Sequence, residues 1–328
     1  MHSSSVLIAV GAALLSGGAM AHSHSDLSYS DLVRRDGLSK RCEASVAAMN
    51  KRRWAERQQK RQAAAPTGNT TWNIVTEAPY YDTLQNNTCI LTEEVTTGPY
   101  IWPQSQTLRQ DITEGQPGIP MILDIGVLDL ETCEPLPDVL VDIWYCNATG
   151  SYSSFTGLSP NTPFEELLDQ LNKTIGDDLH TDDTTFLRGM WPTNDAGITE
   201  FTGIVPGFYV ERTIHIHVQV HENYVIRGNG TVASSTTIST GQLFMAEDLS
   251  ERLMALEPYV THDQINRTTN DIDSIFSDQT KNGWDPTLMV VPMDGENPEN
   301  GIVGYITLGV DTAAKKMKKR ELQAAKKA

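Results

Sequence analysis

The chain has 328 residues and 39% hydrophobic side chains, a composition that can build a folded core and excludes an intrinsically disordered protein. Ten of its 25 lysines and arginines precede residue 66 and seven follow residue 314, whereas 36 of its 42 acidic residues lie in the middle. That acidic middle excludes nucleic acid as an expected partner, because phosphate binding needs a positively charged surface.

The first 21 residues are predicted to be a secretory signal peptide. An apolar run over residues 6–15 is too short to span a bilayer, and Ala19-Met20-Ala21 has the small-x-small pattern of a cleavage site. No later segment is apolar enough to cross a membrane, so we expect a secreted, soluble protein. Acceptor sequons for N-glycosylation agree with secretion and lie at Asn69, Asn86, Asn147, Asn172, Asn229 and Asn266.

The four cysteines also fit an oxidising compartment. Cys42, Cys89, Cys133 and Cys146 form no CxxC pair, so disulfides are expected rather than a zinc site. Four cysteines allow three connectivities. A bond between Cys133 and Cys146 is disfavoured, because the two lie at opposite ends of one turn and strand.

Residues 22–65 are predicted to be a separate basic segment, helical at least in part. Residues 38–65 are rich in Ala, Arg, Lys and Gln and lack Gly and Pro, and Pro66 would stop a helix. A processing protease could remove the segment at its dibasic pairs, which are Arg34-Arg35, Lys40-Arg41, Lys51-Arg52 and Lys60-Arg61. A retained basic helix packed on the acidic core agrees equally well with the sequence.

Residues 66–312 are predicted to form an all-β fold, a β-sandwich of mixed strands that carries the function. Short β-branched and aromatic runs alternate there with clusters of Gly, Pro, Asn and Asp. A Lys-rich tail, 313–328, is expected to be a solvated helix or disordered. The predicted strands cover 121–130, 139–146, 198–201, 207–209 and 213–220, and a short helix is predicted over 164–171.

The strongest chemical signal is the pair His215 and His217 in the strand predicted over 213–220. Side chains alternate along a strand, so both imidazoles point to one face, about 6–7 Å apart. Two such imidazoles can supply half of a transition-metal site. A His-x-His pair is also compatible with a polar strand surface, and the pattern alone does not decide. His221 continues the same parity and is expected to lie outside the ligand set.

Further motifs stand in a fixed order around this pair. Gly150-Ser151-Tyr152 follows the strand that contains Trp144, Pro206-Gly207-Phe208-Tyr209 precedes Arg212-Thr213-Ile214-His215-Ile216-His217, and Gln242-Leu243 comes later. Taken together, the motifs resemble those of the intradiol ring-cleavage dioxygenases, most closely the secreted fungal branch. The resemblance runs from about residue 89 to residue 244.

The resemblance implies one ferric ion, Fe(III), held by Tyr152, Tyr209, His215 and His217. Its implied partners are a small aromatic diol and dioxygen, and the implied reaction cleaves a catechol-type ring to a muconate-type diacid. Tyr209 resembles the ligand that the substrate displaces.

Arg212 and Gln242 resemble the pair that offsets negative charge on the substrate. Strict strand alternation would place Arg212 opposite the two histidines, so a bend between Arg212 and His215 is expected. The preferred substrate and the oligomeric state stay open, because the helical dimerisation segment of the bacterial enzymes has no clear counterpart in this chain.

Two other functions remain compatible with the sequence. Cleavage after Ala21 would make His22 the N-terminal residue, which could bind copper through its amine and ring, as in secreted copper oxygenases. A secreted β-sandwich that binds a ligand or cell-wall component without catalysis is the other alternative. Both predict a protein without stoichiometric iron.

Overall fold

The computed structural model describes residues 37, 41–53, 55–57, 88–90, 98–102, 107–227, 232–280 and 284–313. One sheet contains β1 (Thr88–Ile90), β2 (Pro120–Asp129), β5 (Ile198–Ile204), β8 (Met289–Pro292) and β9 (Ile302–Val310). The other contains β3 (Leu140–Trp144), β4 (Arg188–Pro192), β6 (His215–Ile226) and β7 (Val232–Phe244). The helical elements are α3 (Phe164–Leu171), α4 (Glu247–Met254), η2 (Tyr259–Thr261), α5 (Ser274–Thr280) and η3 (Pro298–Asn300).

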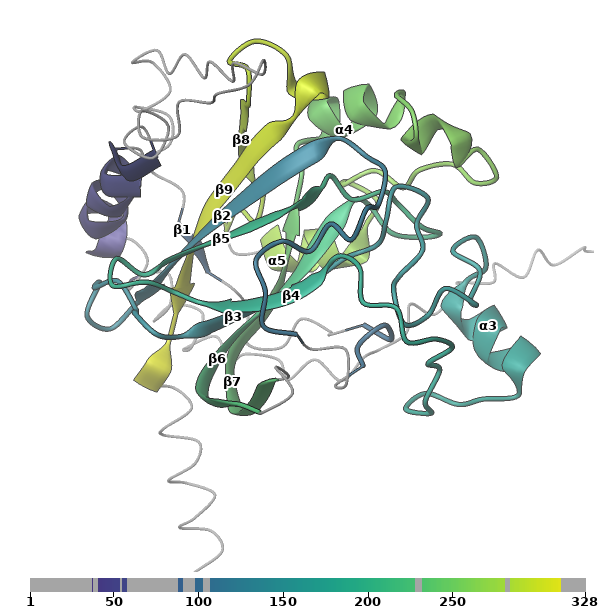
Figure 1. Ribbon diagram of the computed structural model, residues 1–328, viewed down its shortest axis with the longest axis horizontal. Helices are drawn as coiled ribbons and strands as arrows, with labels where there is room; N and C mark the ends of the chain where they lie inside the picture. The colour runs from purple at the N-terminus through teal and green to yellow at the C-terminus, as the bar shows by residue number, and fades with distance from the viewer. Residues whose placement is uncertain are drawn as a thin grey trace, which may run out of the picture.

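The two sheets form a sandwich around an apolar core (Figure 1). The first sheet has the order β1-β9-β2-β5, with β8 paired to β9, and β9 runs parallel to both β1 and β2. The second sheet has the order β4-β3-β6-β7 and is antiparallel throughout. Leu123 and Leu308 from the first sheet meet Ile143 and Val218 from the second in the buried core. The expected all-β sandwich of mixed strands is therefore confirmed.

The predicted elements agree with the structure where the pattern of apolar residues is regular. The strand predicted over 121–130 is β2, and the helix predicted over 164–171 is α3. The strand predicted over 207–209 is wrong, because this stretch is a loop in which Tyr209 makes only an isolated bridge to Arg212. Because of the turn at 209–212, the next strand starts at residue 215 and not at the predicted residue 213.

Several sequence predictions fall outside the described residues. The signal peptide (1–21), His22 and all but the first residue of the tail 313–328 belong to this group, as do the sequons at Asn69, Asn86 and Asn229. Asn172 and Asn266 are exposed. Among the described residues, no helix has the length and apolarity needed to cross a membrane.

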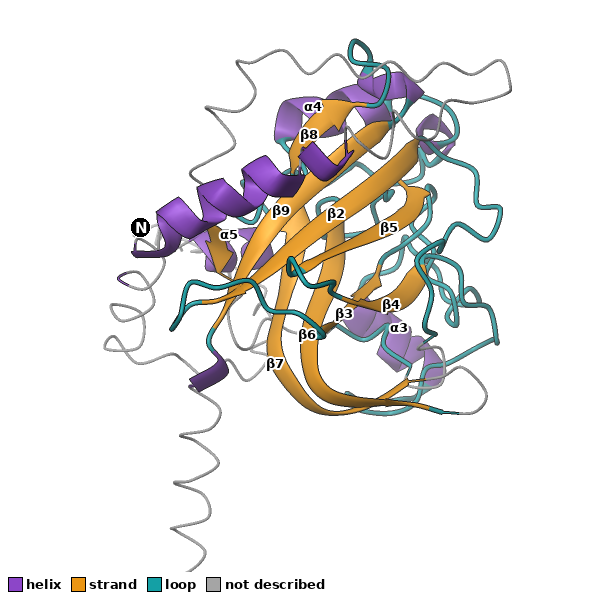
Figure 2. Cartoon of the chain, turned by 60° about the vertical axis from the view of Figure 1, so that its left-hand side comes forward, coloured by secondary structure: helices purple, strands orange, loops and turns teal. Residues whose placement is uncertain are grey.

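A helix from the predicted basic segment packs on the outer face of the first sheet (Figure 2). Residues 41–53 and 55–57 are helical. A methyl group on Gly126 of β2 would lie 3.0 Å from the Met49 side chain and 3.1 Å from that of Arg53, so bare backbone at Gly126 lets the helix come close. The described part of the basic segment is thus packed as a structural element.

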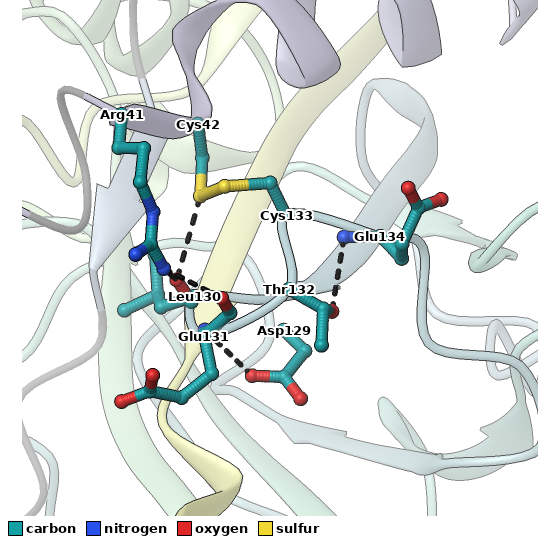
Figure 3. Close-up of a disulfide and its surroundings, with 8 residues drawn as sticks. All are labelled: Arg41, Cys42, Asp129, Leu130, Glu131, Thr132, Cys133 and Glu134. Atoms are coloured by element: carbon teal, nitrogen blue, oxygen red, sulfur yellow. Dashed lines mark hydrogen bonds between the residues drawn. A yellow bond between two sulfur atoms is a disulfide. The ribbon is translucent and has the colours of Figure 1, made fainter.

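A disulfide fastens the start of this helix to the turn after β2 (Figure 3). Cys42 is bonded to Cys133, 91 residues further along the chain. Arg41 adds hydrogen bonds to the carbonyl oxygens of Leu130, at 2.8 Å, and Glu131, at 2.5 Å. Cys146 is buried with a free thiol, in contrast to the expectation that it would be disulfide-bonded.

Buried ion pairs hold the middle and end of the helix. Arg53 and Asp124 are 5% and 4% exposed, and Arg53 Nε donates to Asp124 Oδ1 over 2.9 Å. Arg57 donates to Asp124 Oδ2 over 2.9 Å and also pairs with Glu200 of β5. Because such charges are costly to bury alone, the helix and the sheet depend on each other at this point.

Substitution Arg53→Ala is expected to lower the free energy of unfolding by about 3–5 kcal/mol, because it leaves the Asp124 carboxylate buried with a weakened partner set. The matched control is Arg52→Ala, one residue earlier and exposed, which should change it by less than about 0.5 kcal/mol. Denaturant unfolding of both variants measures the difference. Equal effects would show that the helix is not held by this ion pair.

The same ion pairs predict acid sensitivity. Burial favours a higher pKa for Asp124, but Arg53 and Arg57 outweigh burial and hold its pKa below the ordinary value. A depressed folded pKa adds stability above the unfolded pKa of about 3.9, and this is lost as pH falls through the folded value. Below about pH 4, the wild-type protein should therefore lose stability more steeply than Asp124→Asn. Parallel stability–pH curves would contradict this.

Candidate metal centre

Two tyrosine oxygens and two histidine nitrogens converge at one buried point. Tyr152 Oη lies 3.1 Å from His217 Nε2 and 3.4 Å from His215 Nε2. Tyr209 Oη lies 3.3 Å from His215 Nε2, and the two Nε2 atoms are 3.2 Å apart. All four residues are at most 8% exposed. The structure thus brings together the four side chains that the sequence singled out as metal ligands.

The histidines owe their position to strand alternation in β6. Ile214, Ile216 and Val218 point into the core between the sheets, so His215 and His217 point to the outer face of the second sheet.

Strand β3 lies beside the histidines in the same sheet. Trp144 is the cross-strand partner of His217, and the two rings stack with centroids 4.8 Å apart and planes 4° apart. Trp144 therefore fixes the plane of one imidazole from the neighbouring strand.

An aromatic and aliphatic layer covers this face of the sheet. Tyr100 stacks on Tyr152, with centroids 4.6 Å apart, and meets Tyr209 edge-on at 5.9 Å. Leu167 and Leu168 of α3 belong to the same buried cluster. The cluster shields the four donor atoms from solvent, which strengthens electrostatic interactions among them.

Two glycines allow the tyrosine-bearing loops to touch backbone to backbone. Gly150 has a φ of +84°, and a methyl group there would overlap the carbonyl oxygen of Phe208. A methyl group on Gly207 would lie 2.5 Å from the carbonyl oxygens of Asn147 and Ala148. Each glycine stands two residues before a tyrosine of the site, so this close contact sets the separation of Tyr152 and Tyr209.

Asn147 shapes the turn that leads to Tyr152. Its Oδ1 accepts hydrogen bonds from the backbone nitrogens of Thr149, at 3.1 Å, and Ser151, at 3.0 Å. Its Nδ2 donates to Gln116 Oε1 over 3.1 Å. The amide of this predicted glycosylation sequon is therefore engaged in the fold beside the site.

Burial keeps all four donors neutral in the metal-free protein. It lowers the pKa of His215 and of His217 well below the ordinary value, with nearby Arg212 adding to the effect. Burial raises the pKa of Tyr209 to about 12 and that of Tyr152 well above the ordinary value. Neutral imidazoles can bind a metal, whereas the phenols need a strong cation to lose their protons.

The donor geometry fits a single metal ion. His215 Nδ1 lies 2.6 Å from the carbonyl oxygen of Thr213 and donates to it, which leaves a lone pair on Nε2. His217 Nδ1 is buried without a hydrogen-bond partner among the described residues. Bonds of about 2.1 Å to one ion, at angles between 90° and 109°, separate the donors by about 3.0–3.4 Å. The four observed separations, 3.1–3.4 Å, agree with that range.

The chemistry of the donors favours ferric iron. Phenolate oxygen is hard and anionic, and two phenolates balance two of the three charges of Fe(III). The described residues contain no group of three or more His, Cys, Asp or Glu side chains arranged for a metal. Tyrosines supply half of the donors here, so a site with only two histidines does not form such a group.

Arg212 and Gln242 lie beside the four donors. The tight turn at 209–212, with Glu211 at φ +64°, supplies the expected bend and brings Arg212 Nη1 to 3.5 Å from Tyr209 Oη. Arg212 Nη2 donates to Gln242 Oε1 over 2.5 Å. Gln242 is the cross-strand partner of His217 on β7. The structure thus groups all six residues predicted from the sequence.

Sequence reasoning missed Asp273, and it placed His221 outside the ligand set. Asp273 accepts a hydrogen bond from Arg212 Nε over 2.8 Å, and no motif in the sequence points to it. His221 lies beyond a β-bulge at Val220, where its ring faces Asp142 and Thr237.

Solved structures resemble this chain, although no protein-family model and no curated protein matches it. The intradiol ring-cleavage dioxygenase from Tetranychus urticae is 26% identical over 68% of this chain and 95% of its own, with a TM-score of 0.54. A second dioxygenase, Tetur07g02040, is also 26% identical over the same shares, with a TM-score of 0.53. These likenesses do not test the predicted fungal branch, which stays a prediction.

Substitution Gly207→Ala is expected to weaken iron binding by about 10–100-fold, because the added methyl group forces the Tyr209 loop away from the Tyr152 loop. The control is Gly304→Ala in β9, where a methyl group would make ordinary van der Waals contacts with Leu288, at 3.4 Å, and Leu123, at 3.8 Å. Iron titration measures the affinity, and circular dichroism checks the fold. Unchanged affinity in Gly207→Ala would contradict the role given to the loop contact.

Proposed function

The chain belongs to the intradiol ring-cleavage dioxygenase family, and we propose that it is a secreted enzyme that uses one ferric ion to cleave catechol-type rings with dioxygen. The observation that supports this most directly is the convergence of Tyr152, Tyr209, His215 and His217 at donor separations of 3.1–3.4 Å. When bound, ferric iron would act as a Lewis acid that draws electron density from a chelated diol and makes the ring reactive toward dioxygen.

Tyr209 is the residue proposed to exchange with the substrate. Of the two protons that a catechol would give up on binding, the Tyr209 phenolate oxygen would accept one and a solvent hydroxide the other. Its pKa near 12 in the metal-free site favours the protonated phenol once the bond to the ion is broken. Tyr152, stacked under Tyr100 in the buried cluster, would stay in place as the permanent phenolate ligand.

Arg212 would offset the negative charge that the substrate carries into the site. Its Nη1 lies 3.5 Å from Tyr209 Oη, so a diol oxygen that replaces this phenolate would meet the same guanidinium. Gln242 accepts from Arg212 Nη2 and keeps the guanidinium facing the site. The buried surroundings make such a positioned cation more effective than one in water.

Secretion is proposed from the N-terminal signal pattern and the cysteine chemistry. A disulfide such as Cys42–Cys133 persists in an oxidising compartment and is rare in a reducing one. The exposed sequons Asn172 and Asn266 are accessible for glycosylation. Iron bound through tyrosinates is already ferric, which also suits an oxidising environment.

The purified secreted protein is expected to contain one iron per chain, to absorb broadly in the visible range, and to consume dioxygen with catechol or hydroxyquinol without added reductant. Substitution Tyr152→Phe should abolish the visible band and lower the iron affinity by more than about 100-fold, because it removes a ligand. The matched control is Tyr224→Phe, at a tyrosine whose hydroxyl donates to Asp138 and lies further along β6 than the two histidines.

The outcomes separate the alternatives. Stoichiometric copper without a visible phenolate band would support the copper oxygenase, and a protein with no stoichiometric metal would support the binding protein. Iron-loaded protein that leaves every diol tested unconsumed would overturn the catalytic part of the proposal.

A further inference from the structure

Helix α5 contacts the site through Asp273, the residue that directly precedes the helix. The Asp273 side chain is 0% exposed and has donors on both oxygens. Oδ1 accepts from the backbone nitrogens of Ile275 and Phe276, at 2.8 and 2.9 Å, in the first turn of α5. Oδ2 accepts from Arg212 Nε at 2.8 Å and from the backbone nitrogen of Thr213 at 2.9 Å. Three backbone N–H groups therefore hold the carboxylate in place independently of Arg212.

The contact at Nε decides where the rest of the Arg212 guanidinium points. The group is planar, with its donors in a rigid fork, so a partner fixed at Nε fixes the directions of Nη1 and Nη2. Nη1 then faces Tyr209 Oη and Nη2 faces Gln242 Oε1. Without Asp273, the guanidinium would keep its bond to Gln242 but would lose its contact with Tyr209 Oη when the substrate takes that position.

Helix α5 also holds the partner of Arg212. Gln279, near the end of α5, accepts from the Gln242 backbone nitrogen and donates to the Gln242 carbonyl oxygen, both over 2.8 Å. One short helix thus fixes Arg212 through Asp273 and the Gln242 backbone through Gln279.

A second path leads from Asp273 to a proposed metal ligand. The backbone N–H of Thr213 donates to Asp273 Oδ2, and the carbonyl oxygen of the same residue accepts from His215 Nδ1 over 2.6 Å. That acceptor orients the imidazole and leaves Nε2 free for a metal. A carboxylate that holds the backbone at Thr213 therefore also helps to set the ring of His215.

We propose that Asp273 is a positioning residue that aims the Arg212 guanidinium at the substrate oxygen which replaces Tyr209. This inference rests on the proposed function and extends it to a residue outside the ligand set and outside the family motifs in this sequence. Asp273 does not touch the reacting atoms in this arrangement. It acts through Arg212, and its charge balances that of the partly buried guanidinium.

The test is a double-mutant cycle on catechol binding, measured without dioxygen as the change in the visible spectrum of the iron-loaded protein. Asp273→Asn should weaken catechol binding by about 10–100-fold while iron per chain stays near one. In an Arg212→Gln background the same substitution should add less than about twofold, because its target is gone. Asp271→Asn, exposed in the same loop, is the matched control and should match wild type.

A second measurement needs neither iron nor substrate. In the metal-free protein, the Arg212 Nε–H should exchange slowly with solvent by NMR in wild type and in Asp271→Asn, and rapidly in Asp273→Asn. Rapid exchange in wild type, or effects of Asp273→Asn and Arg212→Gln that simply add, would overturn the proposal. Slow Nε–H exchange in a wild-type protein whose spectrum does not respond to catechol would count against the proposed function and support the placement of Arg212 by Asp273.

Discussion

The structure depends most on the burial of four donor atoms that lie 3.1–3.4 Å from their neighbours in the group. The Nε2 atoms of His215 and His217 stand 3.2 Å apart, and burial disfavours protonation of either ring. Two phenol oxygens complete the group, with pKa values raised by the same burial. A trivalent cation would bind the lone pairs of the two nitrogens and replace the protons of the two oxygens.

The ion pairs that stabilise the fold and the donor atoms of the site lie on opposite outer faces of the sandwich. The N-terminal helix covers the outer face of the first sheet and is held there by Arg53, Arg57 and Asp124. The donor atoms lie on the outer face of the second sheet, with the apolar core between. Figure 1 shows the helix and α3 at opposite sides of the molecule. Substitution of an ion-pair residue should therefore change the free energy of unfolding without altering the arrangement of the four donor atoms.

Short-range rules predict half of the donor set, because strand alternation places His215 and His217 on one face. Tyr152 and Tyr209 were predicted only from the resemblance of their motifs to those of the dioxygenase family. β2 and α3 were also predicted because their apolar patterns are regular. The loop at 207–209 was mistaken for a strand because its aromatic residues match strand preferences, whereas packing against Asn147 decides its path.

What the sequence did not predict depends on contacts between distant segments. Asp273 stands 61 residues after Arg212, and nothing local marks it as a partner. Likewise, four cysteines left three pairings open, and only the packing of the helix selects Cys42 with Cys133. That bond changes what a cut at Lys60-Arg61 would produce. The helix would lose its peptide connection to the sandwich yet remain covalently attached, as a two-chain molecule that separates only under reducing conditions.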